Sequence, residues 1–124
     1  NCWIGPYTLL DGTGGLTIGN NCTISSGVHI YTHSTVERTL LGRKKDGKID
    51  YAPIVIAGNT YIGPQTVITK GVEIGDHCII GAKSLVQHNI PSNSIAFGVP
   101  AKVVGKVIIK NGVITLKYNR DDKK

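Results

Sequence analysis

One stretch of the chain, residues 56–90, decides the fold and reads IAGNTYIGPQTVITKGVEIGDHCIIGAKSLVQHNI. Within it an aliphatic residue returns at every sixth position without a miss. An earlier stretch shares this spacing, and together the aliphatic positions are Ile18, Ile24, Ile30, Ile56, Ile62, Ile68, Ile74, Ile80 and Val86. Four residues after most of them stands a small or β-branched residue, namely Cys22, Val28, Thr60, Thr66, Val72, Cys78, Ser84 and Ile90. Each repeat therefore specifies two inward-facing positions.

A period of six predicts a coil of strands rather than a helix. At 3.6 residues per turn, every sixth residue of a helix would point in a different direction. A short strand followed by a bend instead returns each aliphatic residue to one interior line. Three such sides make a triangular coil whose strands stack about 4.8 Å apart. Glycines follow four of the aliphatic residues, and we expect them to supply the backbone freedom that the corners need.

Composition agrees with an all-β chain of one domain. Among the 124 residues, 17 Ile, 11 Val and 11 Thr stand against 7 Leu, 5 Ala, 2 Glu and no Met, so we expect almost no α-helix. No apolar run approaches the roughly 18 residues that cross a bilayer, and no leader opens the chain, which predicts no membrane insertion. The start in mid-pattern without Met leads us to expect further residues upstream.

Charge and cysteines bear on partners and compartment. The formal charge is +6, and residues 102–124 carry most of it, with seven basic and two acidic side chains. This end is either a solvated basic tail or a binding surface for nucleic acid, anionic lipid or a phosphate-bearing cofactor. No aromatic platform or motif accompanies it, so we expect no nucleic-acid partner. Three cysteines at positions 2, 22 and 78 form no disulfide framework and predict buried thiols in a reducing, cytoplasmic compartment.

Three places interrupt the period. Residues 11–15 shift the register by two, as a corner bulge or small loop would. Residues 31–55 are polar and aperiodic, and we expect an extruded loop, which at that length is usually functional. After residue 106, Asn111-Gly112 between two apolar runs predicts a two-residue hairpin. We therefore assign residues 1–106 to the coil domain and 107–124 to a C-terminal hairpin and basic tail.

The repeats IGNNCT, IGPQTV, IGDHCI and IGAKSL, which begin at residues 18, 62, 74 and 80, carry a family resemblance. They resemble the hexapeptide repeats of the left-handed β-helix acyltransferases, over about residues 4–105, and the chain is similar to sugar, maltose and galactoside O-acetyltransferases. The resemblance implies a left-handed parallel β-helix, a homotrimer with active sites between subunits, and acetyl-coenzyme A as co-substrate without a metal.

His33 is the candidate catalytic residue. The segment His29-Ile30-Tyr31-Thr32-His33 resembles the one in which the family's catalytic histidine stands at the root of the extruded loop. A neutral imidazole there would take the proton of the acceptor as it attacks the thioester directly. Another group must orient the ring through its second nitrogen, and Glu37, Asp50 or a backbone carbonyl are the candidates.

The other histidines receive lesser roles. His29 follows the inward Val28, so its side chain should point outward. His77 occupies a corner and should face solvent. His88 lies where many family members have Lys, in a stretch that helps to form the coenzyme groove, which makes it a candidate cofactor contact.

The resemblance also implies binding residues. Tyr61 stands where the family commonly has a Trp that walls the site, and Lys102 in Gly-Val-Pro-Ala-Lys matches a basic residue near the coenzyme phosphates. Matching positions along the coenzyme groove are Gly81, Ala82, Gln87 and His88, although Gln87-His88 replaces the usual Thr-Lys. Asp11 is similar to an acidic residue of the acceptor pocket, and is otherwise a turn Asp beside Gly.

Together these residues predict an acetyltransferase that moves acetyl from acetyl-coenzyme A to a hydroxyl of a sugar or glycan precursor, as in polysaccharide biosynthesis. One alternative is an N-acetyltransferase acting on a nucleotide-linked amino sugar, and another is a non-catalytic β-helix scaffold. Some left-handed β-helices are zinc carbonic anhydrases with three His ligands, but the spacing of His29 and His33 departs from their histidine pair.

Overall fold

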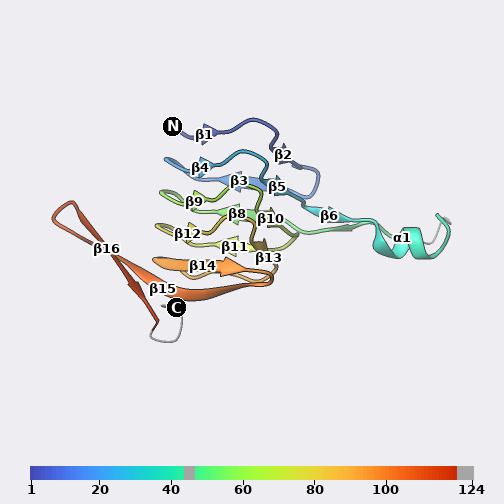
Figure 1. Cartoon of the computed structure of the whole chain (residues 1–124). Helices are drawn as coiled ribbons and strands as arrows, with labels where there is room; N and C mark the ends of the chain where they lie inside the picture. The colour runs from blue at the N-terminus through green and yellow to red at the C-terminus, as the bar shows by residue number, and fades with distance from the viewer. Residues whose placement is uncertain (44–46, 120–124) are drawn as a thin grey trace.

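The chain winds as a three-sided coil of short parallel strands, which the computed structural model describes over residues 1–43 and 47–119. Each turn of the coil visits three sheets in order, so strands far apart in sequence lie side by side along the stack (Figure 1). Ile24 pairs with Ile62 in one sheet, and Ile30 pairs with Ile68 in another. The predicted β class and the stacked arrangement of strands are confirmed.

The three sheets form the three sides of the coil. The first contains β1 (Trp3–Ile4), β4 (Thr23–Ile24), β9 (Tyr61–Ile62), β12 (Ile79–Ile80) and β14 (Ser94–Gly98), followed by antiparallel β15 (Ala101–Lys110) and β16 (Val113–Tyr118). The second contains β2 (Leu9–Leu10), β5 (His29–Ile30), β10 (Val67–Ile68) and β13 (Leu85–Val86). The third contains β3 (Leu16–Ile18), β8 (Ile54–Ile56) and β11 (Glu73–Ile74), and Ile90 bridges to Ile74 at its end.

Bends between the sheets define three corners that run the length of the coil. The first corner, from the first sheet to the second, comprises residues 5–8, 25–28, 63–66 and 81–84. The second corner, from the second sheet to the third, comprises residues 11–15, 31–53, 69–72 and 87–89. The third corner, from the third sheet back to the first, comprises residues 19–22, 57–60, 75–78 and 91–93.

The positions predicted from the six-residue period form the core. Of the nine aliphatic residues, eight are at most 1% exposed, and Ile18 is half-buried. The second inward layer is also buried; it includes Cys22 and Cys78, whereas Cys2 is exposed. Burying one large aliphatic side chain stabilises a fold by about 1.5–3 kcal/mol, so this column is the main source of stability.

The glycines that follow the aliphatic residues serve close packing between coils. A Cβ on Gly75 would lie 2.4 Å from the backbone nitrogen of Ser92, and one on Gly63 would lie 2.7 Å from that of Ala82. The left-handed backbone conformation comes two residues later, for example at His77 with φ 56°. The prediction that these glycines supply the freedom of the corners is therefore wrong, because what they supply is room for the neighbouring coil.

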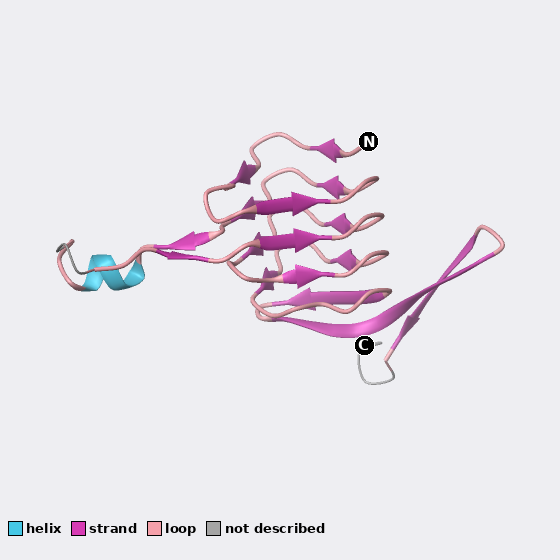
Figure 2. Cartoon of the chain, turned by 180° about the vertical axis from the view of Figure 1, so that it is seen from behind, coloured by secondary structure: helices cyan, strands magenta, loops and turns pink. Residues whose placement is uncertain are grey.

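The predicted extruded loop is an arm that stands away from the coil at the second corner (Figures 1 and 2). Two antiparallel strands, β6 (His33–Ser34) and β7 (Asp50–Tyr51), form its base, and the short helix α1 (Val36–Leu40) follows β6. The sequence pattern missed this helix because none of its residues is buried. Residues 44–46 of the predicted loop lie outside the described residues.

The predicted C-terminal hairpin is present. Strands β15 and β16 pair around Asn111 and Gly112, whose φ values of 50° and 76° suit a two-residue turn. The assigned boundary after residue 106 falls inside β15, whose Val107 packs with Ile95 and Val104 against the end of the coil. Residues 120–124 of the predicted basic tail lie outside the described residues. In the part that is described, no helix is long and apolar enough to cross a bilayer.

Candidate active site at the second corner

Two interruptions of the period fall at the second corner, in adjacent turns of the coil. Eight positions separate Leu10 from Ile18, and 26 separate Ile30 from Ile56, where a regular side would need six. Leu10 pairs with Ile30 in the second sheet, so the segments that follow these residues are stacked on each other. The first insertion thereby brings Asp11 over the root of the arm.

Asp11 and His33 meet at this point. The Asp11 Oδ2 atom accepts a hydrogen bond from Nδ1 of His33 and another, 2.9 Å long, from the backbone N–H of Thr32. The Oδ1 atom accepts from the backbone N–H of Thr13 at 3.0 Å and from the Thr13 hydroxyl at 2.7 Å. The Asp11 side chain is 8% exposed, so four donors satisfy a carboxylate that is almost closed to solvent.

These donors fix the charge of Asp11. The backbone N–H and hydroxyl of Thr13 hold the pKa of the Asp11 carboxyl well below its usual range, and His33 and the Thr32 N–H lower it further. Hydrogen bonds to the charged form stabilise that form, so Asp11 is ionised at neutral pH. The ionised carboxylate of Asp11 accepts a hydrogen bond from an N–H group at Nδ1 of His33. It thereby favours the tautomer of the ring that carries its proton on Nδ1.

His33 is held on one side and open on the other. Its side chain is 35% exposed, and its ring centroid lies 6.2 Å from that of Tyr51, across the β6–β7 base of the arm. With the proton on Nδ1, the Nε2 atom carries the free lone pair. A neutral ring held in this way has the free lone pair and the fixed orientation that a general base requires.

A pocket of about 670 Å³ lies beside His33. Its lining comes from three successive turns of the second corner and consists of Tyr31, His33, Ser34, Val36, Thr69, Lys70, Gln87 and His88. Another hollow, of about 450 Å³, lies on the third sheet and includes Glu73 and Ser92 but no histidine. The second-corner pocket is the better candidate, since it combines an oriented imidazole with hydroxyl and amide groups suited to a polar substrate.

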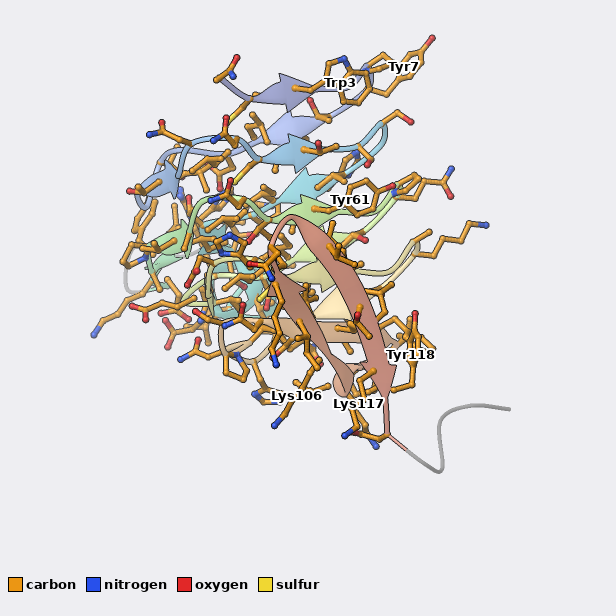
Figure 3. All side chains as sticks on the ribbon, turned by 90° about the vertical axis from the view of Figure 1, so that its left-hand side faces the viewer. Trp3, Tyr7, Tyr61, Lys106, Lys117 and Tyr118 are labelled. Carbon is orange, nitrogen blue, oxygen red and sulfur yellow. The ribbon has the colours of Figure 1, made fainter. Side chains whose placement is uncertain are left out.

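The structure places the predicted site residues in two groups. His33, Gln87 and His88 share the second-corner pocket, and Asp11 supports it from behind. The other group lies on the first sheet and the first corner, and comprises Tyr61, Gly81, Ala82 and Lys102. Tyr61 is 45% exposed in β9, on the same side of the coil as Trp3 and Tyr7 (Figure 3). A single chain therefore does not bring the two groups into one pocket.

The remaining histidines, His29 and His77, do not line the pocket. His29 is half-buried, and its Nδ1 lies 3.2 Å from the Tyr31 hydroxyl. His77 lies at the third corner, where its Nδ1 is 2.7 Å from Oδ2 of Asp76. The four histidines do not converge, and within residues 1–43 and 47–119 no three His, Cys, Asp or Glu side chains gather as metal ligands.

The partner of His33 is the feature that sequence reasoning missed. Glu37, one of the expected partners, instead accepts a hydrogen bond from the backbone N–H of Lys48 at 2.9 Å. Asp50, another expected partner, lies opposite Ser34 in the β6–β7 pair. Asp11 takes the role instead. The strand register contains the signal for this contact, because Leu10 pairs with Ile30 and the residues after them, Asp11 and Tyr31, are therefore neighbours. Reading it from the sequence requires knowing which turns of the coil are adjacent.

Comparisons with known proteins show which families the chain resembles. The family model described as bacterial transferase hexapeptide (six repeats) matches residues 53–88. Galactoside O-acetyltransferase of Escherichia coli (strain K12) is 40% identical over 93 residues, which cover 74% of this chain and 44% of the relative. A putative acetyltransferase of Saccharomyces cerevisiae is 39% identical over 111 residues, covering 86% of this chain and 53% of the relative. The chain thus spans about half the length of the curated relatives it matches.

A solved structure supplies a ligand-bound relative. The hexapeptide-repeat acetyltransferase of Vibrio cholerae, in complex with acetyl-coenzyme A, matches with a TM-score of 0.69 and 29% sequence identity. The match covers 85% of this chain and 60% of that one.

Proposed function

We propose that this chain, which belongs to the hexapeptide-repeat acetyltransferase family, transfers acetyl from acetyl-coenzyme A to a hydroxyl of a sugar or glycan precursor. The observation that carries the proposal is the pairing of Asp11 with Nδ1 of His33 at the edge of the second-corner pocket. A scaffold would need neither this pair nor the two insertions that create it.

In the proposed reaction the acceptor hydroxyl lies against Nε2 of His33. The hydroxyl oxygen forms a bond to the thioester carbonyl carbon while its proton passes to Nε2. The carbon–sulfur bond then breaks, and the coenzyme A thiolate takes the proton back from the imidazolium. The negative charge of Asp11 stabilises the imidazolium between these two steps, and general-base assistance of this kind contributes roughly 10²–10⁴ in rate.

The two groups of predicted binding residues support a homotrimer with sites between subunits. His33, Gln87 and His88 lie at the second corner, whereas Tyr61 and Lys102 lie on the first sheet. A neighbouring chain that turns its first sheet toward this corner would complete one groove from both groups. The first sheet and the adjacent first corner also expose large aromatic side chains, with Trp3 57% and Tyr7 88% exposed, which an interface would cover.

The proposal includes the finer features that the resemblance implies. The coil winds left-handed, residues 1–106 form the acyltransferase domain, and the hairpin and tail over 107–124 are attached to it. We place the reaction in the cytoplasm, because three free thiols suit a reducing compartment.

The test is a coenzyme A release assay with purified protein and a panel of acceptors. Hydroxyl sugars, glycosides, amino sugars and nucleotide-linked amino sugars are each incubated with acetyl-coenzyme A, and the product is identified by mass spectrometry. The proposal expects an ester on a sugar hydroxyl. Formation of an amide on an amino sugar alone would favour the N-acetyltransferase. Absence of both transfer and coenzyme A binding in calorimetry would favour the scaffold.

A further inference from the structure

Lys70 has no role in the reaction described above, yet it lines the same pocket. It is the one Lys, Arg, Asp or Glu among the eight described lining residues. The ion pairs among the described residues join His33 to Asp11 and His77 to Asp76, so Lys70 is not neutralised by any acid in that part of the chain. A cationic group without a partner, in a pocket without acidic lining, favours a negatively charged ligand.

The position of Lys70 indicates which ligand carries that charge. Ile30, Ile68 and Val86 are paired neighbours in the second sheet, so Thr32, Lys70 and His88 occupy equivalent positions in successive turns. Lys70 therefore lies one strand spacing, about 4.8 Å, from the turn that carries His33. The extended arm of coenzyme A between its thioester and its nearest phosphate is several such spacings long. An anion that meets Lys70 while the thioester is at His33 therefore belongs to the acceptor.

We infer that Lys70 is a specificity residue for an acidic acceptor, a sugar whose carboxylate or phosphate group lies close to the hydroxyl that is acetylated. This inference rests on the proposed function and deepens it. Neutral hydroxyl groups of Ser34 and Thr69 also line the pocket and suit the sugar hydroxyls. The carboxylate of Asp11 does not oppose such a ligand, since it is nearly closed to solvent and its oxygens already accept four hydrogen bonds.

Matched pairs of acceptors test the inference. Wild-type protein is assayed with glucose against glucuronate, galactose against galacturonate, and N-acetylglucosamine against N-acetylneuraminate. A charge-assisted contact predicts that the acidic member of at least one pair has a kcat/KM about tenfold higher, and that the advantage shrinks as salt rises. Lys70→Glu should abolish this preference while the KM for acetyl-coenzyme A stays within about twofold. Lys110→Ala, an exposed lysine near the hairpin turn, is the control and should keep the preference.

Two results would overturn the inference. Neutral and acidic acceptors used equally well by wild-type protein would show that the pocket does not select for charge. An increased KM for acetyl-coenzyme A in Lys70→Glu, with acceptor preference intact, would assign Lys70 to the coenzyme phosphates. The proposed function survives both results, because transfer to some sugar continues in each.

A binding measurement decides the case in which no acceptor of the panel is acetylated. Glucuronate and glucose are titrated into wild-type and Lys70→Ala protein while the imidazole signals of His33 and His88 are followed by NMR. The inference expects both signals to move with glucuronate in the wild type, and to move at about tenfold higher concentration in the variant. Equal responses of the two proteins, or none to either sugar, would contradict it.

Discussion

The regular wall of residues 54–90 and the two insertions of the second corner, residues 11–15 and 31–53, follow opposite rules. In the wall, every sixth residue is aliphatic and fully buried, whereas the outward strand positions hold residues as different as Tyr61, Val67 and Glu73. At the second corner the period is broken in two adjacent turns, and these breaks bring Asp11 onto His33. The repeats therefore build the support and one side of the pocket, and the departures from the repeat bring together the pair that we propose to be catalytic.

This division makes the wall the place where stability should be most sensitive. Ile68→Ala removes a side chain that is 0% exposed in the middle of the aliphatic column. Deleting such a side chain costs about 2–5 kcal/mol because apolar contacts are lost and a cavity remains. Urea denaturation should show this loss in the free energy of unfolding. At temperatures where the variant stays folded, its turnover should remain within about twofold of the wild type.

The matched control for the wall is Val67→Ala at the neighbouring outward position, which is half-buried. It should cost much less than Ile68→Ala. Equal costs at the two positions would mean that the interior column is not the main source of stability.

The second corner should show the reverse behaviour. His33→Ala is expected to lower turnover by at least about a hundredfold, since the general base acts in the transition state. Affinity for acetyl-coenzyme A, measured by calorimetry, should be nearly unchanged. His29→Ala, at a half-buried histidine of the second sheet, is the control and should be much milder. If the two substitutions were equally harmful, or His29→Ala worse, His33 would not be the base.

Most buried residues of the wall can be predicted from the sequence, whereas the site at the second corner can be predicted only in part. A period of six with two inward layers is a local pattern, and it predicts the buried residues of both layers. It leaves out Ile54, which is fully buried in β8 although it falls within the predicted loop over 31–55. His33 was also within reach, because it stands at the start of the longest interruption. The Asp11 partnership was not, since it joins residues 22 positions apart across neighbouring turns. The glycine assignment failed for the same reason, because close approach between coils is not visible in one repeat.

Asp11→Asn tests that missed partnership. The amide can no longer stabilise an imidazolium and offers a donor as well as an acceptor to Nδ1, so turnover should fall about tenfold to a hundredfold, less than in His33→Ala. A purely structural loss would leave the ring unchanged, so the decisive readout is the tautomer of His33 from nitrogen NMR. A wild-type tautomer in the variant would contradict the positioning role of Asp11.

Asp11→Asn should also change how the free energy of unfolding depends on pH. Folding lowers the pKa of Asp11 from 3.8, so its contribution to the free energy of unfolding is present above that value and is lost as pH falls below it. Wild-type protein should therefore lose more free energy of unfolding between pH 5 and pH 2 than Asp11→Asn does. Asp76, whose pKa is lowered by the Ser92 hydroxyl and His77, is the matched control at the third corner. Wild-type protein should likewise lose more free energy of unfolding than Asp76→Asn does over this pH range. The turnover of Asp76→Asn should equal that of the wild type.

Lys102→Glu gives the smallest expected effect. It tests whether the first sheet of one subunit meets the second corner of its neighbour. Lys102 is exposed in β15, opposite Phe97, and is absent from the pocket that holds His33. Charge reversal there should raise the KM for acetyl-coenzyme A severalfold with a smaller change in turnover. A lysine acts as a point charge, so the wild-type constant should also rise with salt. Lys110→Glu, further along β15, is the control and should leave it unchanged.

Mixing then distinguishes a site within one chain from a site between chains. Light scattering at micromolar concentration should first report three chains per particle. His33→Ala and Lys102→Glu subunits are next unfolded, mixed and refolded together. If a groove combines His33 of one subunit with Lys102 of its neighbour, some grooves in the mixed trimers contain both wild-type residues. Activity at low acetyl-coenzyme A would then exceed the mean of the two parents. Activity equal to that mean would place both residues in the same chain's groove, and a fully active monomer would remove the trimer from the proposal.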